Sequence, residues 1–142
     1  MFFFVFLSVS QTIRTILLVD DDPDDQMLFS EALFAANAAV IYTSAVDGID
    51  ALEQLHPEAK ILPDLIFMDV NMPRMDGISC LKEIRKSDNL REIPVVMYST
   101  SSYYQKECIE YGALDYIEKP NDYMQLCNTL KNILNSHLPA SV

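Results

Sequence analysis

The 142-residue sequence is poor in glycine, in basic residues and in cysteine. Glycine occurs three times while half of the residues are apolar, which excludes a low-complexity chain and predicts one packed domain. Ten basic residues stand against 21 acidic ones, so the formal charge is -11. That charge argues against binding to nucleic acid or to anionic membranes, because both are polyanions.

The few cysteines argue against a disulfide or zinc framework. Cys80, Cys108 and Cys127 are odd in number, form no CxxC pair and fall in segments of helical pattern. We therefore expect buried or ordinary free thiols, and the reducing cytoplasm as the compartment.

The start of the chain, residues 1–11, is apolar but far too short to span a bilayer. It also lacks the basic region that opens a signal peptide. Two interpretations stay open: a disordered or misassigned leader, or an extension that packs on the domain or on a second copy. We assign residues 12–142 to the domain and keep a homodimer as an alternative.

Short β-rich runs alternate with segments of helical period along the rest of the chain. Strands are expected at Thr15–Val19, Val40–Ala45, Leu65–Met68, Val95–Tyr98 and Tyr116–Glu118. Helices are expected at Asp24–Ala36, Asp47–Leu55, Asp76–Lys86, Tyr103–Tyr111 and Asn121–Leu134. This order predicts an α/β fold of the (βα)5 type, with a parallel sheet between two layers of helices.

Chemically active side chains follow four of the expected strands. Asp20 and Asp21 come after the first, Asp69 after the third, Ser99 after the fourth and Lys119 after the fifth. The carboxyl ends of parallel strands share one sheet edge, so these groups converge. Carboxylates held this close would raise one another's pKa without a cation, and Mg2+ prefers oxygen ligands. The sequence therefore predicts a metal-dependent acidic site.

Such a site suits acyl phosphate chemistry. An ionised aspartate can attack a phosphoryl group while a cation neutralises charge on the transferring oxygens. Lys119 can then pair with the added phosphate, and the Ser99 hydroxyl can hydrogen-bond to one of its oxygens.

Four segments, in this order, resemble the motifs of response regulator receiver domains. They are LLVDDD at residues 17–22, MDVNMPRMDG at 68–77, PVVMYS at 94–99 and GALDYIEKP at 112–120. The resemblance runs from about Thr15 to the end of the chain, and implies a flavodoxin-like fold with strand order 2-1-3-4-5.

The resemblance implies a role for each acidic residue. Asp69 would accept a phosphoryl group from a histidine kinase or a phosphotransfer protein. Asp20, Asp21 and Asp69 would hold Mg2+ together with the backbone carbonyl of Asn71.

The resemblance also implies how the phosphoryl group is bound and sensed. Ser99 and Lys119 would stabilise it, and the bond from Lys119 to Pro120 is expected to be cis. Ser99 and Tyr116 would form the switch, although Tyr98, Tyr103 and Tyr104 stay open as alternatives for the aromatic partner.

The chain further resembles stand-alone receivers, either the chemotaxis receiver or the small regulators paired with bacterial phytochromes. We expect no output domain and no enzyme activity beyond the protein's own phosphorylation and dephosphorylation. An unknown output protein would read the changed surface of the fourth helix, fifth strand and fifth helix, which carries Tyr103, Tyr104, Lys106, Glu107, Glu110, Tyr111 and Tyr123.

Two departures from the family pattern stand out. Thr100 occupies a position that is commonly a small residue, so its bulk is expected to narrow access to Asp69 and slow exchange with water. Asp22, Asp24 and Asp25 add charge that the metal does not need, and we interpret them as start signals for the first helix.

Two other interpretations use the same acids. Asp20, Asp22, Asp24 and Glu31 match the first, third, fifth and twelfth positions of an EF-hand loop, but Asp25 replaces the turn glycine and a strand precedes where a helix is required.

A haloacid-dehalogenase-like phosphatase also places Asp-x-Asp after its first strand, as Asp20 and Asp22 stand here. That interpretation leaves Asp69 without a role. Each site residue has a structural explanation when taken singly, since strand-end aspartates often cap helices. Their joint order at successive strand ends favours the receiver.

Overall fold

A computed structural model describes residues 13–56, 58 and 61–136, so the expectations for residues 1–11 lie outside the described part. Five parallel strands form the central sheet: β1 (Thr15–Val19), β2 (Ile41–Ala45), β3 (Leu65–Met68), β4 (Val95–Ser99) and β5 (Asp115–Glu118). Their order is β2-β1-β3-β4-β5, which confirms the predicted flavodoxin-like α/β fold.

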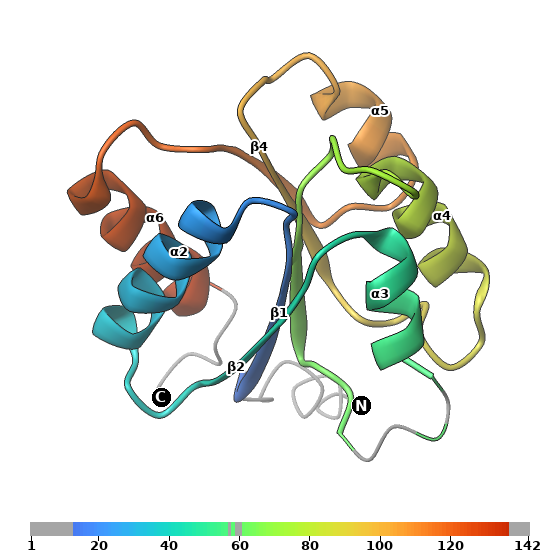
Figure 1. Ribbon diagram of the computed structural model, residues 1–142, viewed down its shortest axis with the longest axis horizontal. Helices are drawn as coiled ribbons and strands as arrows, with labels where there is room; N and C mark the ends of the chain where they lie inside the picture. The colour runs from blue at the N-terminus through green and yellow to red at the C-terminus, as the bar shows by residue number, and fades with distance from the viewer. Residues whose placement is uncertain (1–12, 57, 59–60, 137–142) are drawn as a thin grey trace, which may run out of the picture.

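Helices cover both faces of this sheet (Figure 1). They are α2 (Pro23–Ala36), α3 (Gly48–Gln54), α4 (Gly77–Lys86), α5 (Gln105–Glu110) and α6 (Tyr123–Ser136). Helices α2 and α6 lie on one face, and α3, α4 and α5 lie on the other. The described part contains no helix with both the length and the apolar character that a membrane crossing requires.

The helix starts differ from the predicted ones where a cap decides them. Helix α2 begins at Pro23 because the Asp22 side chain accepts from the backbone N–H groups of Asp24 and Asp25. Helix α6 begins at Tyr123 rather than at Asn121, because the Asp122 carboxylate accepts from the N–H of Gln125. Helix α5 is shorter than predicted, since Tyr104 offers no capping side chain.

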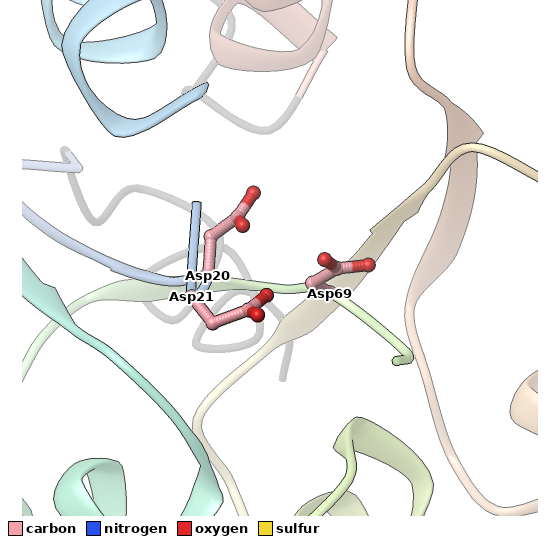
Figure 2. A group of neighbouring side chains, drawn as sticks. All are labelled: Asp20, Asp21 and Asp69. Atoms are coloured by element: carbon pink, nitrogen blue, oxygen red, sulfur yellow. The ribbon is translucent and has the colours of Figure 1, made fainter. Parts of the chain in front are cut away.

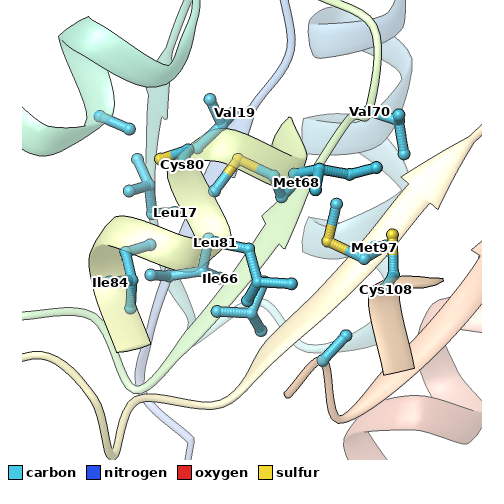
Figure 3. Close-up of a cluster of buried hydrophobic side chains, with 14 of the residues drawn as sticks. Leu17, Val19, Ile66, Met68, Val70, Cys80, Leu81, Ile84, Met97 and Cys108 are labelled. Carbon is cyan, nitrogen blue, oxygen red and sulfur yellow. The ribbon is translucent and has the colours of Figure 1, made fainter. Parts of the chain in front are cut away.

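Two apolar clusters hold the layers together, and alternate strand residues supply them. In β1, Leu17 and Val19 face α3, α4 and α5, whereas Ile16 and Leu18 face α2 and α6. Figure 3 shows the first of these clusters, which also buries Cys80. Because both faces of the three inner strands β1, β3 and β4 are covered, these strands read as nearly continuous apolar runs, whereas the edge strands β2 and β5 are mixed in character. The expectation of free thiols is confirmed for Cys80, Cys108 and Cys127.

Candidate functional site

Strand pairing continues past the ends of the strands and positions the site residues. The backbone N–H of Asp20 donates to Ala45 at 3.0 Å, and that of Asp69 donates to Val19 at 2.9 Å. The N–H of Lys119 donates to the carbonyl of Ser99 at 2.7 Å. The ladder therefore brings side chains from four strand ends to one edge of the sheet.

Three carboxylates meet at this edge, as Figure 2 shows. Asp20, Asp21 and Asp69 each offer an oxygen, and these oxygens lie within 4.8 Å of one another. Asp20 is fully buried and Asp69 is 7% exposed, while Asp21 is exposed to solvent. A set of hard oxygen donors with one open side fits a Mg2+ or Mn2+ ion that keeps several waters.

Among the described residues, Lys119 is the cation that forms ion pairs with Asp20 and Asp69. Its Nζ donates to Oδ2 of Asp20 at 2.9 Å and to Oδ2 of Asp69 at 3.3 Å. A third bond, at 2.8 Å, runs to Oδ2 of Asp25 on α2. The interpretation of Asp25 as a helix-start residue alone is therefore incomplete, because the fold brings Lys119, in the segment between β5 and α6, to the first turn of α2.

The pKa values of this group show an imbalance of charge. Burial raises the pKa of Asp69 to about 6; Lys119 opposes that rise and Asp20 adds to it. Burial also raises the pKa of Asp20, against hydrogen bonds from Asp22 and Lys119. Burial lowers the pKa of Lys119, but its bonds to Asp25 and Asp20 outweigh this and raise that pKa above its ordinary value. One ammonium leaves the buried carboxylates partly uncompensated.

Ser99 and Tyr116 are both buried beside the site. Ser99 has no exposed surface, and its Oγ accepts from the N–H of Ser101 at 3.4 Å. The Tyr116 ring is 6% exposed, and its hydroxyl donates to the carbonyl of Ser101 at 2.5 Å. The ring is thus turned into the molecule and tied to the loop after β4. Tyr103 is 83% exposed, so it does not occupy this position.

The other predicted site residues lie in loops at the same edge. Asn71 follows β3 and is exposed, and Thr100 follows β4 and is also exposed. The expected cis bond is not found: the Lys119–Pro120 peptide is trans, as are the other peptide bonds of the described residues.

The loop between β3 and α4 is held by residues that we did not predict from the sequence. Arg74 has a positive φ of 61°, and its guanidinium binds the Asp47 carboxylate with two bonds of 2.7 and 3.0 Å. Hydrogen bonds from Arg74 lower the pKa of Asp47. In sequence, Asp47 is readable as a helix cap, and it does cap α3. Nothing local indicates its second partner, which lies 27 residues away.

Gly77 allows the same loop to pass close to the acceptor. A Cβ at this position would lie 1.9 Å from the carbonyl oxygen of Asp69, so no side chain fits. The N–H of Gly77 donates to the carbonyl of Val70 at 2.8 Å. Close packing against the Asp69 backbone therefore requires glycine at position 77 of the MDG motif.

The fold argues against both other interpretations of the acids. A calcium-binding EF-hand needs a helix before its loop, but β1 precedes Asp20. Asp22, the second acid of the Asp-x-Asp pattern, is exposed and caps α2 instead of joining the acidic group.

An acidic pocket with a lysine, at the carboxyl edge of a 2-1-3-4-5 parallel sheet, defines a receiver-type α/β protein. The family model of the response regulator receiver domain matches residues 16–131. This chain belongs to that family, and is part of a response regulator of a two-component system.

Solved structures of high similarity are response regulators. The phosphorylated cyanobacterial phytochrome response regulator RcpA is 31% identical with a TM-score of 0.82, covering 92% of this chain and 98% of RcpA. The Mn2+-bound response regulator Rcp1 is 28% identical with a TM-score of 0.79, covering 91% of this chain and 97% of Rcp1.

Some curated relatives are much longer. The protein-glutamate methylesterase/protein-glutamine glutaminase of a Nocardioides species is 30% identical over 128 residues, which cover 87% of this chain. The chain spans about a third of the length of that relative, 34%. The resemblance thus concerns only part of that relative.

Proposed function

We propose that Asp69 accepts a phosphoryl group from a phosphohistidine of a histidine kinase or phosphotransfer protein, in a reaction that requires Mg2+. The observation that carries this proposal is the meeting of Asp20, Asp21 and Asp69 within 4.8 Å. Lys119 lies 3.3 Å from the Asp69 carboxylate. The acceptor therefore belongs to the acidic group and also contacts an ammonium, an arrangement that favours phosphoryl transfer.

The residues present fit the ion that the proposal requires. Asp20, Asp21 and Asp69 would hold it, with the backbone carbonyl of Asn71 as a fourth protein ligand. When bound, a divalent cation supplies charge neutralisation for the phosphoryl oxygens and keeps the carboxylates ionised. Support comes from Rcp1, whose solved structure contains Mn2+. RcpA supports the acceptor chemistry, because its solved structure is phosphorylated.

The transfer itself uses side chains of this chain. An Asp69 oxygen forms a bond to phosphorus while the bond from phosphorus to the donor histidine nitrogen breaks. The pKa of Asp69, raised to about 6, still leaves the carboxylate mostly ionised at neutral pH. Lys119 then pairs with a phosphoryl oxygen, and the Ser99 hydroxyl donates to another.

The signal is proposed to leave the site through Ser99 and Tyr116. A phosphoryl group adds charge and acceptor oxygens, which draw the Ser99 hydroxyl toward Asp69. Tyr116 holds the loop after β4 through its bond to the Ser101 carbonyl, so it couples the site to that loop. An output protein or a second copy would then read the surface of α5, β5 and α6, where Tyr103 lies just before α5, Tyr111 just after it and Tyr123 at the start of α6, all three exposed.

The rest of the proposal follows from the family and the charge. The protein's chemistry would be limited to its own phosphorylation and dephosphorylation, with the cytoplasm as compartment. Nucleic acid and anionic membranes are not expected as direct partners, because the formal charge is -11.

Phosphotransfer from labelled histidine kinases tests the central claim. We expect the wild type and the control Asp24→Asn to be labelled with Mg2+ present, and Asp69→Asn to stay unlabelled. Adding a chelator should abolish labelling of the wild type, and the bound phosphate should be hydroxylamine-sensitive, as an acyl phosphate is. Equal labelling of Asp69→Asn, or labelling that ignores the chelator, would contradict the proposal.

A further inference from the structure

Asp25 is the one partner of Lys119 that lies outside the acidic group. Among the described residues, Lys119 binds three carboxylates, and two of them, Asp20 and Asp69, belong to the proposed metal site. The shortest bond, 2.8 Å, is the one to Asp25. The longest, 3.3 Å, is the one to the acceptor Asp69.

Lys119 and a divalent cation compete for the same oxygens. One oxygen of Asp20 already accepts from the N–H of Asp22, and its other oxygen accepts from Lys119. The two oxygens of Asp69 are engaged in the same way: one accepts from the N–H of Val70, and the other accepts from Lys119. A cation that binds must share the oxygens of both carboxylates with the ammonium or displace the ammonium from them. The position of Lys119 therefore affects how tightly the cation binds.

An ammonium has three N–H donors, and here each donor has its own carboxylate. The Lys119 side chain is 10% exposed, so a donor without a partner would have little water to replace it. Without Asp25, the ammonium would therefore bind Asp20 and Asp69 more closely. With Asp25, one donor is kept on the α2 side of the pocket.

The place of Asp25 is well determined by its helix. Pro23 opens α2, and the Asp22 side chain accepts from the N–H of Asp25 at 3.4 Å. The Tyr98 ring lies 5.3 Å from Lys119 Nζ and limits where the ammonium can move. Asp24, the neighbour of Asp25, is exposed, and no ion pair of Asp24 is found within the described part of the chain.

We propose that Asp25 is a positioning residue that holds one donor of Lys119 on the α2 side of the pocket and so weakens the hold of the ammonium on the metal oxygens of Asp20 and Asp69. It lets the cation enter, and it keeps the ammonium within reach of the phosphoryl group once Asp69 carries one. This inference rests on the proposed function, because it assigns Asp25 a part in the same site.

Binding of Mn2+ alone to the purified full chain tests the inference without phosphorylation. Free Mn2+ is measured by electron paramagnetic resonance for the wild type, Asp25→Asn and Asp24→Asn, which remove the same charge from neighbouring positions. We expect Asp25→Asn to weaken Mn2+ binding by about threefold to tenfold, and Asp24→Asn by less than about twofold. Asp25→Glu, which keeps the carboxylate, should recover part of the loss.

A double-mutant cycle with Lys119→Met shows whether the effect runs through the lysine. In that background, Asp25→Asn should weaken Mn2+ binding no more than Asp24→Asn does. Circular dichroism of each variant checks that the fold is kept, and the Asp24 variant controls for charge. Equal effects of the two substitutions in the wild-type background would overturn the inference, and so would an undiminished Asp25→Asn effect beside Lys119→Met.

The same titration separates this inference from the proposed function. A wild type that fails to bind Mn2+ would overturn the metal site and Asp25's role with it. A wild type that binds Mn2+, with Asp25→Asn and Asp24→Asn alike, would overturn only the role of Asp25.

Discussion

Two cationic side chains hold the loops around the acidic edge, and they face very different amounts of negative charge. Lys119 is 10% exposed and binds the carboxylates of Asp20, Asp25 and Asp69. Arg74 is 58% exposed and binds Asp47 alone, through two bonds. The first region has more acids than its cation can balance, whereas the second is a matched pair.

The pKa shifts of the two regions run in opposite directions. Burial raises the pKa of Asp69 to about 6, even with Lys119 beside it. Hydrogen bonds from Arg74 lower the pKa of Asp47, although that carboxylate is only 3% exposed. The matched pair of Arg74 and Asp47 stabilises the folded chain. The acidic cluster around Lys119 keeps an excess of negative charge, which favours binding of a further cation. The two regions lie at the same sheet edge, but the Lys119 cluster has the charge of a binding site, whereas the Arg74–Asp47 pair is a structural clamp that holds the β3–α4 loop.

The largest effect should come from Gly77→Ala, which disturbs both regions through the loop that joins them. The new Cβ would meet the carbonyl oxygen of Asp69, which is backbone and cannot turn aside. We expect the free energy of unfolding to fall by about 3 kcal/mol or more. Urea denaturation measures this. The control is Gly48→Ala, whose Cβ would have side-chain atoms of Met75 as its nearest neighbours, at 2.6 to 2.9 Å, and a larger loss in the control would refute the argument.

Asp69→Asn should stabilise the protein when metal is chelated, because it removes a carboxylate that the fold keeps at a raised pKa. The Asp69 carboxyl group binds its proton more tightly in the folded chain than in the unfolded chain, because its pKa is higher in the folded chain. The contribution is therefore fully present below about pH 4 and is lost as pH rises toward about 6. At pH 7 we expect a gain of about 1 to 3 kcal/mol in unfolding free energy.

Denaturation in a chelator at pH 4 and pH 7 measures the Asp69→Asn effect, with the exposed Asp24→Asn as control. The gain should appear at pH 7 and shrink at pH 4. A variant less stable than the wild type at pH 7 would show that the acidic cluster is not under electrostatic strain.

Arg74→Gln should produce the opposite dependence on pH, with a smaller effect. The lowered pKa of Asp47 gives stability that is present above about pH 4 and is lost as pH falls through the folded value. We expect a lower urea midpoint at pH 7 and a flatter acid limb, with labelling of Asp69 retained. Arg91→Gln, which breaks an exposed pair with Asp88 at 3.5 Å, is the matched control. Equal losses of stability from Arg74→Gln and Arg91→Gln would contradict a special stabilising role of the Arg74–Asp47 pair.

Thr100→Ala should have the smallest effect, on rate alone. Less bulk beside Ser99 should speed the loss of phosphate from Asp69 by about twofold to fivefold, which is under about 1 kcal/mol in the barrier. Decay of the labelled protein measures it, with the exposed neighbour Ser102→Ala as control. An unchanged decay would mean that Thr100 does not limit access.

Much of the site is readable along the chain because four of the five strands end at or just before a residue that the chemistry needs. Asp69 follows a buried apolar run, and Lys119 follows the short run of β5, so the alternation of elements predicts where both lie. The strand bounds of β1 and β3 match the prediction for the same reason. Helix starts were less predictable, since Asp122 and Asn121 are both good caps and only the fold selects between them.

What the sequence by itself determined is the order of strands and helices, and the set of strand-end residues that parallel pairing must bring together. What only the tertiary structure decided is how charges pair across that edge. Asp25 binds a lysine 94 residues away, and Asp47 binds an arginine 27 residues away. Both acids are already explained by their place at a helix start, so nothing in the nearby sequence indicates a distant partner. Pairing at such separations is set by the packing of α2 against α6, which brings the segment after β5 to the first turn of α2, and by the β3–α4 loop lying beside the start of α3.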